Sequence, residues 1–222
     1  MPSPGPRVNT CVVDTSNDRW RSVFERAAES FVEMTETVPR ERWDSPGLGV
    51  WSLRDLAGHT SRALTTIETY LAREPEQTTL DGPLAYLAAA AAAGATAEGA
   101  GAIAARGREA GAALGPDVAA SAREIADRVV ALVDRTADDA PVATAAGGIV
   151  LADYLPTRVL ELTVHTLDMS AALGTKPPDR LREPIAACLG LVAEAIGETS
   201  QAGDVLLALL GRRSLPANLH LI

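Results

Sequence analysis

The sequence is poor in aromatic residues, cysteine and histidine, and each shortage narrows what the chain can be. Aromatic residues make up 4% of the 222 residues, so aliphatic side chains and alanine must supply most of the core. The two cysteines, Cys11 and Cys188, are too few for a disulfide framework, which favours a reducing compartment. We interpret both as free thiols, Cys188 buried on a helix and Cys11 in a loose N-terminal segment.

The chain also lacks an excess of positive charge and any long hydrophobic run. Its formal net charge of -9 at pH 7 opposes binding to nucleic acids and to anionic membranes. The most apolar stretch, residues 84–93, is soon broken by Gly94, Gly99 and Gly101, so no membrane-spanning helix is expected. The first residues lack a basic start followed by an apolar run, so we expect no secretory signal. These absences predict a cytoplasmic protein with neither nucleic-acid nor membrane partners. The sequence leaves open whether the protein is a monomer or a homodimer.

Helical periodicity dominates the rest of the sequence, and no alternating strand pattern stands out. Ser52 and Asp55 predict a capping box at the start of a helix, and Gly174 predicts the end of another. The stretch 138–148 is expected to be a loop. The expected helices cover residues 16–38, 52–74, 117–134, 151–173, 179–196 and 204–210, with one or two thin helices within 83–114.

These helices predict an all-α fold, a four-helix bundle with additional inserted and C-terminal helices. Residues 1–15 are expected to form a disordered or loosely packed leader, residues 16–175 the bundle, and residues 176–222 a C-terminal helical extension packed on it.

The three histidines, His59, His165 and His220, are the residues most informative about chemistry. Glu161 and His165 are four residues apart, so they lie on one face of their expected helix. His59 lies on the apolar side of its own helix. Two imidazoles and one carboxylate form a common metal-binding set that leaves positions open for water or substrate, with zinc as the default and iron(II) or nickel as alternatives. The same residues have a second explanation without a metal, in which His59 is a hydrogen-bonded core residue and Glu161 and His165 form a surface pair. We interpret His220 as a surface residue.

Two aspartates are spaced so that they could orient a ligand imidazole. Asp168 follows His165 by three residues, and Asp55 precedes His59 by four. The predicted capping box already explains Asp55.

At these residues the sequence resembles the DinB-like and mycothiol-dependent maleylpyruvate isomerase superfamily. The segment VWSLRDLAGHTSRAL is similar to its signature Trp-Ser-x-Arg-Asp-Leu-x-x-His. The segment YLPTRVLELTVHTLDMSAALG is similar to a second signature, Arg-x-x-Glu-x-x-x-His-x-x-Asp followed by Ala-Leu-Gly. The resemblance implies a DinB-like four-helix bundle with a divalent metal, usually zinc, held by His59, Glu161 and His165.

The resemblance also implies a metal-dependent enzyme that activates a low-molecular-weight thiol for attack on a small electrophilic substrate. Known members include isomerases and S-transferases that use mycothiol in actinobacteria, the group that this composition favours. Arg158 and Asp168 are the predicted catalytic residues. Arg62 and Arg212 are predicted to bind the thiol or a substrate carboxylate, as is Arg213, unless these arginines form ion pairs within the protein.

Two further interpretations stay open. The bundle can host a thiol-independent metalloenzyme, such as a hydrolase, a lyase or a biosynthetic enzyme. It can also be a non-catalytic, metal-stabilised interaction protein, which a fourth ligand such as Asp168 or Asp55 would favour. The isomerase carries a larger C-terminal domain that helps to form its site, and the short stretch after Gly174 predicts that this domain is truncated or absent here.

Overall fold

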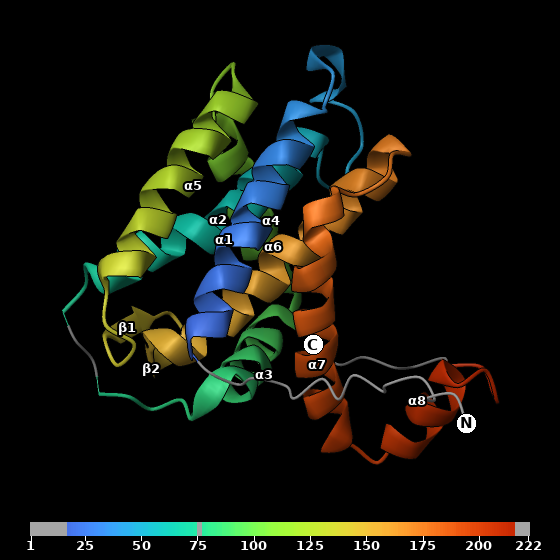
Figure 1. The fold of residues 1–222 in the computed structure, drawn as a ribbon. Helices are drawn as coiled ribbons and strands as arrows, with labels where there is room; N and C mark the ends of the chain where they lie inside the picture. Colours follow the sequence, from blue (N-terminus) through green and yellow to red (C-terminus); the bar gives the residue numbers. More distant parts are fainter. Residues whose placement is uncertain (1–16, 75–76, 216–222) are drawn as a thin grey trace, which may run out of the picture.

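The computed structural model describes residues 17–74 and 77–215, in which helices predominate (Figure 1). Four helices contact one another in a ring, in which α1 packs on α5 and α6, and α2 packs on the same two helices. This arrangement confirms the predicted all-α bundle. Its members are α1 (Asn17–Glu36), α2 (Leu53–Leu71), α5 (Val118–Arg135) and α6 (Leu151–Leu173).

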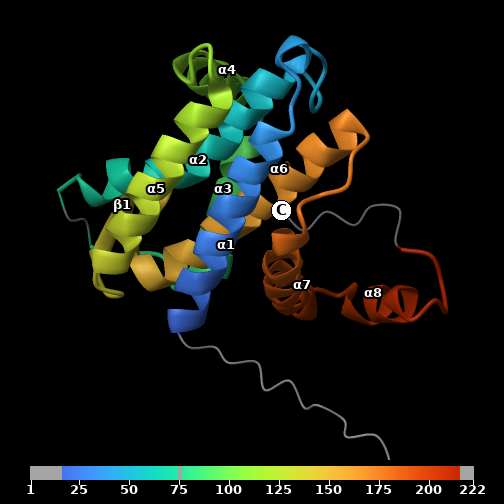
Figure 2. The ribbon, with the colours of Figure 1, turned by 45° about the horizontal axis from the view of Figure 1, so that its top comes forward.

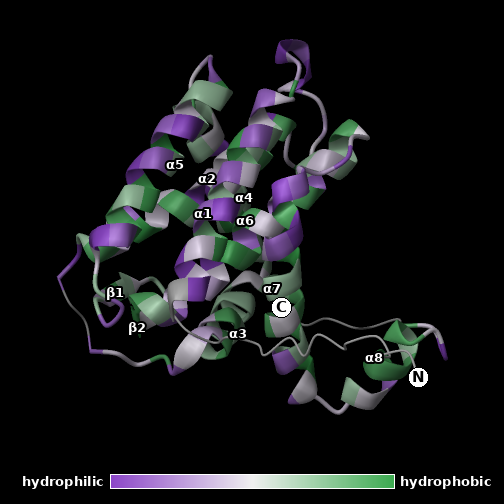
Figure 3. Ribbon diagram, viewed as in Figure 1, coloured by the Kyte–Doolittle hydropathy of each residue, from purple (hydrophilic) through white to green (hydrophobic). Residues whose placement is uncertain are grey.

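The four helices pack around a core that consists mainly of aliphatic side chains, with few aromatic ones. Apolar residues recur along the inward faces of the helices, whereas the outward faces are hydrophilic (Figure 3). Phe24 and Phe31 of α1 are completely buried, as are Leu64 of α2 and Leu162 of α6. The expected burial of Cys188 is confirmed.

Two inserted helices, α3 (Gly82–Gly94) and α4 (Ala97–Ala113), occupy the stretch rich in alanine and glycine. Helix α4 packs closely on α2, and α3 packs on α6 (Figure 2). The crossing of α2 and α4 depends on glycine, because a Cβ atom added to Gly58 would lie 2.0 Å from the backbone nitrogen of Gly111. The small residues therefore let α4 approach the helix that carries His59.

The predicted helix ends are present. The side chain of Ser52 accepts a hydrogen bond from the backbone N–H of Asp55 at 3.2 Å, and the Asp55 carboxylate accepts one from the backbone of Ser52 at 3.1 Å. This capping box starts α2. Gly174 ends α6 in the left-handed conformation, with a φ of 67°.

The prediction of a loop over residues 138–148 was wrong, because the chain forms an antiparallel hairpin there. Strand β1 (Pro141–Thr144) pairs with β2 (Gly147–Val150). Each strand has four residues, and only Val142 and Ile149 contribute large buried side chains, so no alternating pattern is visible in the sequence. The Thr144 hydroxyl accepts a hydrogen bond from the Ala146 N–H and donates one to the carbonyl of Gly147, which fixes the turn.

After α6, the chain forms an extension on the outside of the bundle. Helix α7 (Arg182–Gly197) packs on α1 and α6, whereas α8 (Ala202–Leu209) packs on α7 and stands away from the bundle (Figure 2). Short 3-10 helices cover Arg40–Arg42 and Asp179–Leu181. Residues 1–15, Cys11 and His220 lie outside the described residues, so the predictions for them stay predictions.

Within the described residues, no single helix combines the length and the apolar character that crossing a membrane requires. Helices α3 and α4 meet those criteria only when taken together, and they are bent by 102° relative to each other.

Candidate metal centre

Helices α2 and α6 bring His59, Glu161 and His165 together beside the bundle core. The Nε2 atom of His165 lies 3.4 Å from Oε2 of Glu161, one helical turn away on α6. The Nε2 atom of His59, on α2, lies 3.7 Å from the same oxygen. The imidazoles are largely buried, with side-chain exposures of 17% for His59 and 16% for His165. Both helices therefore direct a ring nitrogen toward one carboxylate oxygen.

The geometry and the donor set of this triad fit a divalent metal ion. Ligand atoms that share a tetrahedral zinc ion lie about 3.4 Å apart, because each is about 2.0–2.1 Å from the metal. The three ligand atoms of His59, Glu161 and His165 all lie within 4.8 Å of one another. No fourth His, Cys, Asp or Glu joins this group among residues 17–74 and 77–215, so a metal ion held here would have three protein ligands and a position left open.

Asp168 lies against His165 on the side of the ring that faces away from Glu161. The Nδ1–H of His165 donates to Oδ2 of Asp168 at 3.0 Å, an arrangement typical of residues that orient a metal-binding histidine. Burial alone would lower the pKa of His165, but the hydrogen bonds to Asp168 and Glu161 outweigh it and raise the pKa to about 9.

The charge of Glu161 is stabilised from several sides. Burial would raise its pKa, but the hydrogen bonds to His165 and His59 and the positive charge of Arg158 outweigh burial and hold the pKa well below its usual range. Glu161 is therefore a carboxylate at neutral pH, the form that binds metals.

Arg158 lies one turn before Glu161 on α6, with 7% of its surface exposed. Its guanidinium donates to the hydroxyls of Thr157 at 3.1 Å and Tyr86 at 3.3 Å, and its central carbon lies 4.5 Å from the ring centroid of Tyr154. It forms no salt bridge with any described residue. Burial acts against its charge, but the tyrosines and Glu161 outweigh burial and raise the pKa of Arg158, so it stays a cation.

A cavity of about 680 Å³ opens beside the triad, large enough for a small-molecule substrate. His59 and Glu161 line it, and its remaining walls come from α2, α3, α4, α6 and the hairpin turn. Four arginines line the cavity, whereas Glu161 is its only carboxylate among the described residues. These arginines are Arg62, Arg73, Arg106 and Arg158. The cavity is thus positively charged within an acidic protein.

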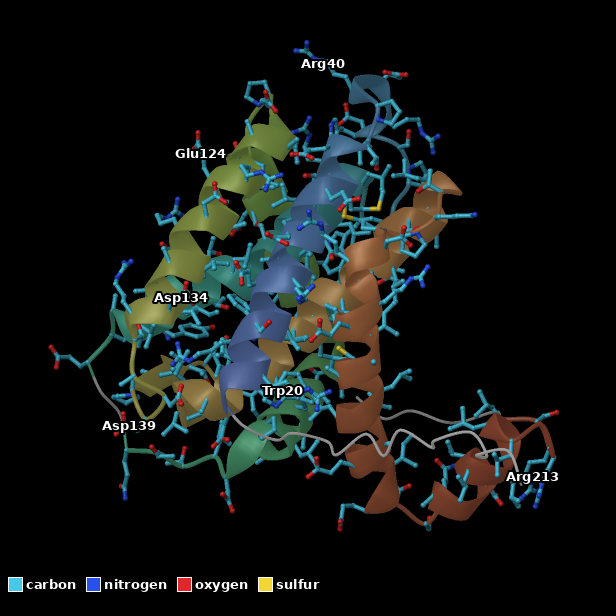
Figure 4. The ribbon with its side chains drawn as sticks, viewed as in Figure 1. Trp20, Arg40, Glu124, Asp134, Asp139 and Arg213 are labelled. Carbon is cyan, nitrogen blue, oxygen red and sulfur yellow. The ribbon has the colours of Figure 1, made fainter. Side chains whose placement is uncertain are left out.

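Of the three other arginines predicted to bind a ligand, the structure places one at the cavity and two away from it. Arg62 lines the cavity, as its predicted role requires. Arg212 and Arg213 follow α8, which packs on α7, and neither lines the cavity; Figure 4 shows Arg213 beyond α8. Arg213 forms an ion pair with Asp204, the alternative considered for the arginines. The position of Arg212 gives no support to a thiol-binding role, which stays a prediction.

The sequence-based prediction missed two aromatic residues of this region. Tyr86, whose hydroxyl meets Arg158, is the single aromatic residue of the stretch 83–114, and this isolation was an available signal. Trp51 stacks on His59 with ring centroids 4.4 Å apart. Trp51 directly precedes the capping box, a position that indicates a helix start and gives no sign of a contact with His59.

Comparison with known proteins agrees with this arrangement. Residues 24–170 match the family described as mycothiol maleylpyruvate isomerase N-terminal domain, which is part of the DinB-like superfamily. The match includes the whole of α2 and α5, most of α1 and α6, and the triad. No curated protein and no solved structure matches the chain significantly. With a bundle, a triad and a family match that agree, the chain belongs to the mycothiol maleylpyruvate isomerase N-terminal domain family.

Proposed function

We propose that this protein is a metal-dependent enzyme that binds a low-molecular-weight thiol, with mycothiol as the expected one, and directs it to a small electrophilic substrate. The observation that carries the proposal is the triad of His59, Glu161 and His165, which has three ligands and borders the large cavity. Zinc is the expected metal, although the same ligands also accept iron(II) or nickel. We expect the reaction to take place in the cytoplasm, where such thiols stay reduced.

Each residue of the site has a distinct role in this proposal. His59, Glu161 and His165 would hold the metal, and Asp168 would keep His165 in the tautomer that presents Nε2 to it. A bound divalent metal lowers the pKa of a coordinating thiol and stabilises the nucleophilic thiolate. The protein's residues hold the two reactants close together, which turns a reaction between free molecules into one within a complex.

Arg158 and Arg62 would bind an anionic group of the substrate. Each lies one turn from a metal-ligand residue on the cavity side of its helix, Arg158 before Glu161 on α6 and Arg62 after His59 on α2. A buried guanidinium that forms no salt bridge with any described carboxylate is costly, and an anionic ligand would neutralise it. This site therefore favours electrophiles that carry a carboxylate or a similar group.

The other interpretations have less support. A closed structural site would need a fourth protein ligand, but Asp55 caps α2 and Asp168 binds the far side of His165. A thiol-independent metalloenzyme would use the same triad, and the binding experiment below separates it from the proposed function.

Calorimetric titration of the metal-loaded protein with mycothiol tests the proposal. We expect saturable binding to the metal-loaded protein and none to E161Q, which lacks the ligand charge but keeps its shape. E194Q, altered at an exposed position of α7, should bind as the wild type does. A metal-loaded wild-type protein that does not bind millimolar mycothiol would contradict the thiol role and favour the thiol-independent enzyme.

A further inference from the structure

The two histidines of the triad differ in what orients them. The Nδ1–H of His165 donates to Asp168, whereas Nδ1 of His59 is buried and has no hydrogen-bond partner among the described residues. Ligand histidines usually use their second nitrogen in a hydrogen bond that fixes the ring. Some other contact must therefore hold the ring of His59 in place.

Trp51 makes that contact. Its indole is 9% exposed and lies against the imidazole of His59, with centroids 4.4 Å apart and planes inclined by 30°. It also meets the ring of His165 edge-on, with centroids 6.5 Å apart. Trp51 does not line the cavity, so it supports the triad without contacting a ligand there.

Trp51 is in turn held by α4. Its Nε1–H donates to the backbone carbonyl of Ala104 at 3.1 Å. At Gly107 a Cβ atom would lie 2.9 Å from Nε1 of Trp51, so only glycine leaves room for the indole there. Helix α4 is itself fixed to α2 by the crossing of Gly58 and Gly111. The indole thus spans from α4 to a metal-ligand residue of α2.

We propose that Trp51 is the positioning residue of His59, and that its ring contact takes the place of the hydrogen bond that Nδ1 of His59 lacks. This inference rests on the proposed metal centre. It gives α4 an indirect role in metal affinity. The helix contains none of the proposed metal ligands, but it determines where the indole of Trp51 lies. Loss of the partner that orients a ligand histidine lowers metal affinity by roughly 10- to 100-fold, which is the size of effect expected for Trp51.

Zinc affinity, measured by competition with a chromophoric chelator, tests the inference in the wild type and four variants. The visible spectrum of bound cobalt gives a second readout. We expect W51L to bind zinc at least about tenfold more weakly than the wild type and to give a changed visible spectrum with cobalt. W51F keeps an aromatic ring against His59 and should recover most of the affinity. G107A should weaken binding without changing any residue of the triad.

W43L is the matched control, because Trp43 is also buried, at 5% exposure, and makes no ring contact with either histidine. It is expected to lower stability while leaving zinc affinity and the cobalt spectrum unchanged. A G107A protein that binds zinc as tightly as the wild type would overturn the inference even if W51L does not fold. A wild-type protein that binds no zinc would overturn the metal centre itself, and the inference with it.

Discussion

Oδ2 of Asp168 lies 3.0 Å from Nδ1 of His165, while Nε2 of the same ring faces Glu161 at 3.4 Å. The carboxylate of Asp168 therefore fixes the orientation of the imidazole, and it would keep the proton on Nδ1 when a metal replaces the one on Nε2. We predict that D168A lowers zinc affinity by roughly 10- to 100-fold while the three ligand residues remain. Chelator competition measures this loss. D134A changes an exposed aspartate of α5, seen in Figure 4, and should have the wild-type affinity.

Arg158 should be dispensable for folding but needed for anion binding. Methionine at this position keeps an extended side chain and removes a buried charge, which is often neutral for stability. We predict that malonate, a small dicarboxylate, raises the thermal midpoint of the wild type and not that of R158M, because a ligand stabilises only a protein that binds it. R135M, altered on the exposed side of α5, should keep the full response. A malonate response that is equal in R158M and the wild type would count against the anion site.

The crossing of α2 and α4 should tolerate no side chain at Gly58. A Cβ atom there would lie 2.0 Å from the backbone nitrogen of Gly111, so the helices would have to separate. We predict that G58A lowers the free energy of unfolding by about 1–3 kcal/mol, measured by urea denaturation. Gly190 is an exposed glycine of α7 with no atom near its Cβ position, so G190A should raise that free energy by about 0.5–1 kcal/mol. A stable G58A protein would show that the crossing is looser than described.

Much of the fold could be predicted from the sequence because α1, α2 and α5 are strongly amphipathic and several helix ends are clear. Ser52, Asp55 and Gly174 were identified correctly as helix-end residues. The hairpin could not be predicted, because its strands depend on pairing with each other. They also depend on the backbone N–H groups of residues 79 and 80, which donate hydrogen bonds to the carbonyl of Gly148. Tertiary pairing of this kind leaves little trace in local sequence.

The triad was predictable in part, because spacing placed Glu161 and His165 on one face. That His59 meets them was one open interpretation of the residues, which the family resemblance then favoured, since no local pattern relates α2 to α6. The environment of Arg158 and the contact between Trp51 and His59 depend on where α3 and α4 pack. An alanine-rich helix has almost no preferred face, so the sequence did not indicate that packing.

Cys188 should be a poor nucleophile. Its side chain is buried between α7 and the bundle, and burial raises the pKa of the thiol to about 11. At pH 8 about 0.1% of such a thiol is ionised, compared with about a quarter of a free cysteine. We predict that a C11S protein reacts very slowly with iodoacetamide at pH 8, faster as the pH rises, and rapidly in guanidinium. Rapid labelling of the native protein at pH 8, followed by mass spectrometry, would contradict this picture.

The most direct test of a metal centre formed by His59, Glu161 and His165 is the ratio of zinc to protein. It is measured after the protein is loaded with zinc and the excess is removed. Elemental analysis should find one zinc ion per chain in the wild type and in E194Q. It should find almost none in E161Q, because the carboxylate oxygen of Glu161 is the atom that both imidazoles face. A full complement of zinc in E161Q, or no zinc in the wild type, would contradict the account.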